Sequence, residues 1–154
     1  MKDQEFDGRR CREIRKALEG TKEAIKRNTH ERKLIERDLR NARRMRDQKF
    51  NQVNSILNNL ALPASIIAAI IELLKQGTPL QRAIDSAGKS LGALDISNAV
   101  QTSSLEGQLD SLNRDIEVLE ERILSNRNYH TKKEGVLRAL SQEGRKLNCV
   151  LPHP

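Results

Sequence analysis

Apolar residues recur at alternating steps of three and four along the path from Cys11 to Leu60. Ten of the fifteen positions on this path are aliphatic, alanine or cysteine, which is the spacing of an amphipathic helix. The polar exceptions include Asn28 and Arg32. Neither Pro nor Gly interrupts residues 21–62. The pattern therefore predicts one long helix over about residues 1–60.

The last third of the chain repeats this pattern from Leu105 to Leu151. Ten of fourteen positions on the path are Leu or Ile, and the polar positions include Asn126 and His130. Because proline cannot continue a helix, Pro152 is expected to close this one. A second long helix is predicted over about residues 101–151.

Residues 61–100 have a different character. Pro63 interrupts the first helix, and residues 64–75 are apolar nearly all round, which is typical of a buried helix. Gly77 marks its end, and Thr78-Pro79 resembles the start of a short helix that Gly88 closes. The segment is expected to form an apolar tip built from short helices.

The two long helices are predicted to fold against each other as an antiparallel hairpin in which facing residue numbers add to about 160. This register places the polar positions Asn28 and Asn126 near each other, and a basic run at 37–46 opposite an acidic run at 115–121. Matching polar positions across a helix pair is cheaper than leaving one unpaired. With about 45 residues in each arm, the stalk spans roughly 70 Å. Ion pairs are expected between the helices among Arg40, Arg43, Arg44, Glu117, Glu120 and Glu121.

The fold class expected is therefore all-α, a long antiparallel coiled-coil helical hairpin that forms a single elongated domain over residues 1–154. The tip carries more apolar surface than one chain can cover, so the protein is expected to be oligomeric. A dimeric four-helix bundle and a larger ring both remain open. The residues expected to hold subunits together, or to meet a membrane, are Ile66, Ile67, Ile70, Ile71, Leu73 and Leu74.

Composition agrees with exposed helices rather than with a sandwich or barrel. Aromatic residues make up 2% of the chain and charged residues 32%. The longest apolar run has six residues, against the roughly 20 that a membrane span needs. The charged start of the chain does not resemble a signal peptide. These features predict a cytoplasmic location, or one within a macromolecular assembly.

The two cysteines, Cys11 and Cys149, are too few for a disulfide framework. The hairpin register places them at the same level of the open end, although Cys149 lies off the apolar path. A reducing cytoplasm keeps such residues as thiols. Free thiols that a short bifunctional reagent can join within one chain are therefore expected.

The net charge of +7 arises from 28 basic and 21 acidic residues, and residues 1–50 alone hold 17 basic and 10 acidic ones. Clustered cations gain affinity for nucleic acid by releasing counterions from phosphate. The basic residues near the open end lack an evident acidic partner, whereas those at 37–46 face acids. No aromatic residues are interleaved for base stacking, which disfavours single-strand recognition. The candidate phosphate contacts are Arg9, Arg10, Arg12, Arg15 and Lys16.

No catalytic, metal or cofactor site is predicted. The string from Ala83 to Ser90 fits a relaxed phosphate-loop spacing, but a helix rather than a strand precedes it. The histidines, His30, His130 and His153, do not have the spacing of a zinc site or a catalytic triad.

The primary functional hypothesis is a non-enzymatic structural or assembly protein that oligomerises and binds other proteins. One alternative is a nucleic-acid-associated packaging or virion protein that uses its basic N-terminal third. The other is a membrane-active hairpin, pore-forming or translocating, that uses the apolar tip.

Overall fold

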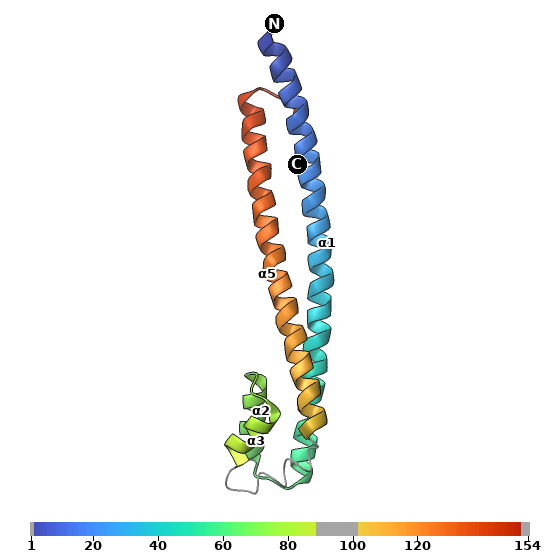
Figure 1. Ribbon diagram of the computed structural model, residues 1–154, viewed down its shortest axis with the longest axis vertical. Helices are drawn as coiled ribbons and strands as arrows, with labels where there is room; N and C mark the ends of the chain where they lie inside the picture. The colour runs from blue at the N-terminus through green and yellow to red at the C-terminus, as the bar shows by residue number, and fades with distance from the viewer. Residues whose placement is uncertain (1, 89–101, 152–154) are drawn as a thin grey trace. The chain divides into compact units, whose positions relative to one another are not determined.

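The computed structural model of the protein describes residues 2–88 and 102–151, and Figure 1 shows the course of the chain. Within these ranges the structure is helical and has no strand. The helices are α1 (Lys2–Asn59), α2 (Ala64–Lys75), α3 (Leu80–Gly88) and α5 (Thr102–Lys146). The predicted all-α class is confirmed, with two long helices and short helices between them.

The chain forms two compact units. Unit 1 consists of Met1–Glu36 together with Glu121–Pro154, and unit 2 consists of Arg37–Glu120. Each long helix contributes one segment to each unit, and the units are described separately below.

Unit 1 is an antiparallel pair of helical segments, seen as the blue part of α1 beside the red part of α5 (Figure 1). Ile14, Leu18 and Ile35 of α1 are buried in the pair. Asn28 and Asn126 are also buried, and each side-chain amide donates a hydrogen bond to the other residue's backbone carbonyl, at 3.2 and 3.0 Å. The prediction that these polar positions face each other is confirmed.

The helix α5 ends at Lys146, earlier than predicted. Asn148 adopts a left-handed backbone conformation with φ 57°, and the Cys149 amide donates to the Gly144 carbonyl at 2.8 Å. Together with the bond from the Asn148 amide to the Arg145 carbonyl, this forms a Schellman motif, which stops a helix. The chain then turns back, and the side chain of Leu151 lies against Gly144. The expected terminator, Pro152, lies outside the described residues.

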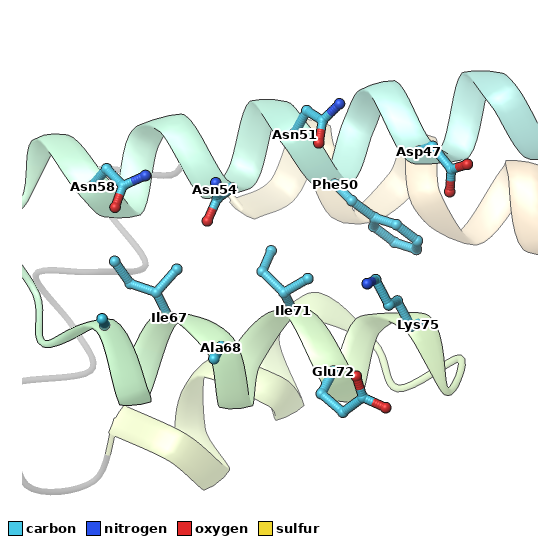
Figure 2. Close-up of a pocket in the computed structure, with 11 residues that line it drawn as sticks. Asp47, Phe50, Asn51, Asn54, Asn58, Ile67, Ala68, Ile71, Glu72 and Lys75 are labelled. Atoms are coloured by element: carbon cyan, nitrogen blue, oxygen red, sulfur yellow. The ribbon is translucent and has the colours of Figure 1, made fainter.

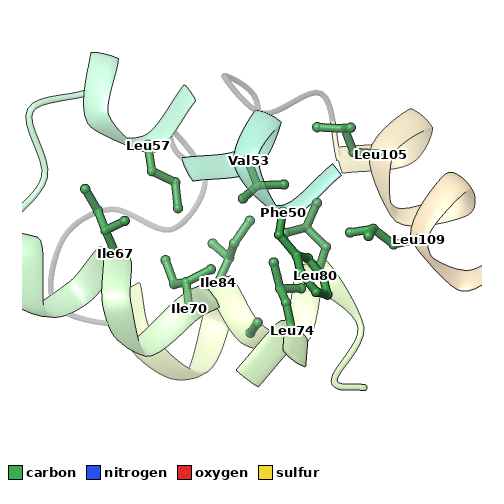
Figure 3. Packing of buried hydrophobic residues seen from close by; sticks show 11 residues of the cluster. Phe50, Val53, Leu57, Ile67, Ile70, Leu74, Leu80, Ile84, Leu105 and Leu109 are labelled. Atoms are coloured by element: carbon green, nitrogen blue, oxygen red, sulfur yellow. The ribbon is translucent and has the colours of Figure 1, made fainter. Parts of the chain in front are cut away.

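Unit 2 is built around one apolar cluster, which Figure 3 shows. The helix α2 lies beside the last turns of α1, with Ile67 and Ile71 pointing toward it (Figure 2). The cluster joins Phe50 and Val53 of α1 to the two short helices and to Leu109 of α5 (Figure 3). Its buried members are Phe50, Val53, Leu57, Ile67, Ile70, Leu74, Leu80, Ala83, Ile84, Leu105 and Leu109.

The short helices of unit 2 begin and end close to the predicted residues. Gly77, with φ 89°, ends α2 in a second Schellman motif, because the Thr78 amide bonds to the Leu73 carbonyl at 3.0 Å. The helix α3 begins one residue after Pro79, whose carbonyl accepts from Ala83. The string that resembles a phosphate loop is helical as far as Gly88, and its Lys89 and Ser90 lie outside the described residues.

Candidate interaction surfaces

An open groove of about 800 Å³ runs between α1 and α2 in unit 2 (Figure 2). The wall from α1 is largely polar, because asparagines recur at three- and four-residue steps beside the buried apolar positions. The facing wall from α2 is apolar except at Glu72 and Lys75, and the small side chain of Ala68 leaves room. The lining residues are Asp47, Phe50, Asn51, Asn54, Asn58, Ala64, Ile67, Ala68, Ile71, Glu72 and Lys75.

The chemistry of the groove fits a protein segment better than a small charged ligand. Its floor offers the ring of Phe50 and the branched side chains of Ile67 and Ile71. The exposed amides of Asn51 and Asn54 can each donate and accept hydrogen bonds along one edge. Interfaces between proteins combine such an apolar centre with a polar rim.

The six residues predicted to hold subunits together divide into two groups. Ile67, Ile70 and Leu74 are buried in the cluster of unit 2. Ile66, Ile71 and Leu73 are half-buried and pack at its edge. The helix α2 therefore buries one side, whereas the alanines of its other side, including Ala68 and Ala69, are exposed. This exposure agrees with the expectation that one chain cannot cover the whole apolar tip, and burial of the rest by a second chain stays a prediction.

The predicted belt of ion pairs is reduced to one contact between the helices. Arg43 and Glu120 meet at 3.0 Å, with both side chains about half exposed. Arg44 instead donates to Asn41 of its own helix, at 3.4 Å. Arg40 and Glu117 are exposed and make no ion pair within residues 37–88 and 102–120. Glu121 is exposed and belongs to unit 1.

Arg46 is a partly buried cation of α1 in unit 2 that contacts an aromatic ring. Its guanidinium lies 5.7 Å from the centre of the Phe50 ring and donates to Asn113 at 3.4 Å. A cation over an aromatic face is attracted by the electrons of the ring. This contact stabilises Arg46 at a position of the apolar path. The sequence pattern alone shows a polar residue there and does not predict its contact with Phe50.

In unit 1, one of the candidate phosphate contacts, Arg10, already forms ion pairs with acidic residues of the chain. Arg10 binds both carboxylate oxygens of Glu143, at 2.7 and 2.8 Å, and also contacts Glu13 at 3.1 Å. These carboxylates raise the pKa of Arg10 above its usual range, and the hydrogen bonds from Arg10 lower the pKa of Glu143. The prediction that Arg10 lacks an acidic partner is wrong, because the predicted register sets Arg10 opposite residue 150, whereas its long side chain reaches Glu143.

The other four candidate phosphate contacts keep an accessible charge. Arg9, Arg12, Arg15 and Lys16 are exposed and have no ion-pair partner within the part of unit 1 that the structure describes.

Cys11 and Cys149 form a disulfide, with their Cα atoms 5.5 Å apart. The expectation of free thiols is therefore wrong. It rested on a reducing location and on the position of Cys149 off the apolar path of the helix. The turn at Asn148 instead carries Cys149 off the end of α5 and toward Cys11.

The histidines do not gather into a site. His130 contacts Glu134 of its own helix at 2.9 Å, and His30 is exposed. His153 lies outside the described residues. Within residues 2–88 and 102–151, there is no group of three or more His, Cys, Asp or Glu side chains that could hold a metal ion.

Sequence reasoning missed the groove and the disulfide. The row Asn51, Asn54 and Asn58 flanks the apolar path and could have indicated a polar edge beside the core. Asparagine at position 148 is a residue type that tolerates the left-handed conformation, and it could have indicated the early end of α5.

Among the described residues, no helix has the length and apolar character needed to cross a membrane. No protein-family model, no curated protein and no solved structure matches this chain.

Proposed function

We propose that this protein is a non-enzymatic assembly protein, a coiled-coil hairpin that self-associates through unit 2 and binds other proteins. The observation that carries the proposal is the open groove between α1 and α2. It has an apolar floor, a polar rim and room for the side chains of a partner helix.

A second copy of the chain is the occupant that suits the groove. The exposed alanines on α2, Ala64 and Ala68, are small enough to let another helix approach closely. Beside them, Ile71 is only half-buried, so a partner would remove further apolar surface from water. Two copies related by a twofold axis would present the same face of α2 to each other, as in most homodimers.

The proposal is tested by light scattering coupled to size exclusion, on the wild type and two matched variants. Ala68→Glu places a charge in the groove, whereas Ala69→Glu places the same charge on an exposed position of α2 outside the groove. We expect the wild type and Ala69→Glu to share a mass that is a multiple of 17.5 kDa, and Ala68→Glu to have the mass of one chain. A wild type that remains monomeric at high concentration contradicts the proposal, as does an equal response of the two variants.

The cytoplasmic location expected from the sequence stays a prediction, and the disulfide weighs against it. Disulfides persist mainly in oxidising compartments. Thiol titration of protein from its natural host, without reductant, tests the two alternatives: no reactive thiol favours an oxidising compartment, and two favour a reducing one.

A further inference from the structure

We propose that unit 1 binds the phosphate backbone of duplex nucleic acid without reading its sequence. The proposal goes beyond self-assembly, and it rests on surfaces of unit 1 alone.

The two units differ in charge. Unit 1 contains 18 basic and 11 acidic residues, whereas unit 2 contains 10 of each, so the whole net charge of +7 belongs to unit 1. The excess is shared by both helical segments, because residues 1–36 hold 11 basic and 8 acidic residues and residues 121–154 hold 7 and 3. The charge is therefore a property of a folded unit made from both ends of the chain.

A stripe of mostly basic residues runs along α1 beside its buried positions. Steps of three and four from Arg12 to Lys33 pass through positions that, except for His30, directly follow the residues of the apolar path and so lie roughly 100° from them around the helix. These positions carry five basic residues, one histidine and one acid. All but Lys22 are exposed, and Lys22 is half-buried. The stripe consists of Arg12, Arg15, Glu19, Lys22, Lys26, His30 and Lys33.

The stripe has the dimensions of a duplex contact. At 1.5 Å per residue it extends roughly 30 Å, close to one turn of duplex DNA at about 34 Å. Duplex DNA presents one negative charge per about 1.7 Å of its axis, so the exposed cations Arg12, Arg15, Lys26 and Lys33 can each reach a phosphate.

The segment of α5 in unit 1 adds cations of its own. Arg127, Lys132 and Arg138 are exposed. An open groove of about 470 Å³ is lined by Arg27 of α1 and Arg122 of α5, beside the buried pair Asn28 and Asn126. Both helices thus contribute to the positive charge of unit 1.

The chemistry of the stripe favours duplex phosphate over the other polyanions. It contains no aromatic residue on which the bases of a single strand could stack. It also lacks the large apolar side chains with which an amphipathic helix enters a membrane surface. Contacts made only by Arg and Lys to phosphate position a protein but carry no sequence information.

The test compares two triple variants of the full chain that remove the same charge from the same helix. The unit 1 variant is Arg15→Gln, Lys26→Gln, Lys33→Gln. The unit 2 control is Arg37→Gln, Arg40→Gln, Arg44→Gln, which also changes exposed residues. Affinity for two unrelated duplexes is measured by fluorescence anisotropy over a range of salt concentrations, and circular dichroism checks that each variant is helical.

We expect the wild type to bind both duplexes alike, with an affinity that falls steeply as salt rises. The unit 1 variant should bind both more weakly, and its slope of log affinity against log salt should be shallower by about three, since each lost phosphate contact removes roughly one. The unit 2 control should retain the wild-type slope. Equal losses in the two variants would show that net charge rather than the stripe acts, and would overturn the proposal. Absence of duplex binding at low salt, a strong preference for one sequence, or tighter binding to phosphatidylserine vesicles than to the duplexes would overturn it as well.

Discussion

Gly135 and Gly144 both lie in α5 but differ in what a methyl group would meet there. Around Gly135 there is no side chain within 4 Å of an added Cβ, whereas at Gly144 the nearest atom of Leu151 lies at 2.8 Å. Glycine inside a helix costs about 1 kcal/mol relative to alanine. Whether replacing a helical glycine by alanine raises or lowers the free energy of unfolding therefore depends on what packs against that glycine.

We expect Gly135→Ala to raise the free energy of unfolding by about 1 kcal/mol. Gly144→Ala should raise the free energy of unfolding clearly less, or lower it, because Leu151 must move to admit the methyl group. Urea denaturation followed by circular dichroism measures both. If the two substitutions stabilise equally, Leu151 does not pack on Gly144 in solution.

The contact between Arg10 and Glu143 gives a second prediction for single residues, in its dependence on pH. The pKa of Glu143 is lowered in the folded state, so its contribution to stability is present above its unfolded pKa and is lost as the pH falls through its folded pKa. Glu143→Gln should therefore lower Tm at neutral pH and have little effect in strong acid. Because the pair is partly exposed, the effect should be small and should weaken as salt is added. A difference in Tm that stays constant from neutral pH into strong acid would contradict this assignment.

At the scale of elements, the spacing of apolar residues at steps of three and four was sufficient to predict α1 and α5, because a long path with this spacing is compatible with few structures other than a helix. It failed at the end of α5, where Leu147 and Leu151 continue the spacing although the chain has already turned. There the Schellman motif around Asn148 overrides the pattern. The groove could not be predicted, since it depends on which side of α2 packs against α1.

The charges of unit 2 are separated by element, which leads to a prediction about pairs of residues. The α1 segment in unit 2 carries six basic and two acidic residues, and residues 102–120 of α5 carry one basic and five acidic ones. Only Arg43 and Glu120 meet as an ion pair between these helices, among the residues described. In a double-mutant cycle, Arg43→Glu and Glu120→Arg should therefore be non-additive, by about 0.5 kcal/mol.

Arg40→Glu and Glu117→Arg supply the matched cycle, because both residues are exposed on the same two helices and lack that contact. Their effects on the free energy of unfolding should add. If Arg40 and Glu117 are coupled and the coupling energy vanishes when the protein is diluted, the two residues pair between chains. If the coupling energy is the same at all protein concentrations, they pair within one chain and the structure assigns their partners wrongly.

For the whole molecule, the disulfide joins two distant parts of the chain, with a sequence separation of 138. Closing a loop of this length lowers the entropy of the unfolded chain, by an amount worth about 5 kcal/mol in the chain-entropy treatment. Measured effects are commonly smaller, at about 2–4 kcal/mol.

Reduction should accordingly lower Tm without abolishing the helical spectrum, since the seam and the Asn28–Asn126 pair remain. The variant Cys11→Ser, Cys149→Ser should match the reduced protein and should not respond to reductant. Calorimetry with and without reductant measures the shift. An unchanged Tm in the wild type, together with two titratable thiols, would show that the bond does not form.

The bond between Cys11 and Cys149 also determines how the chain carries mechanical load. Tension applied to the chain outside residues 11 and 149 passes directly from one sulfur atom to the other, and the residues between them bear none of it. The apolar cluster and the helix pair then need not resist the pull, however weak they are. In the reduced protein the same tension acts on the ends of two antiparallel helices, and it separates them one seam contact at a time, beginning near Ile14 and Leu18. Oxidation thus converts a structure that unzips under force into one whose resistance is that of a covalent bond.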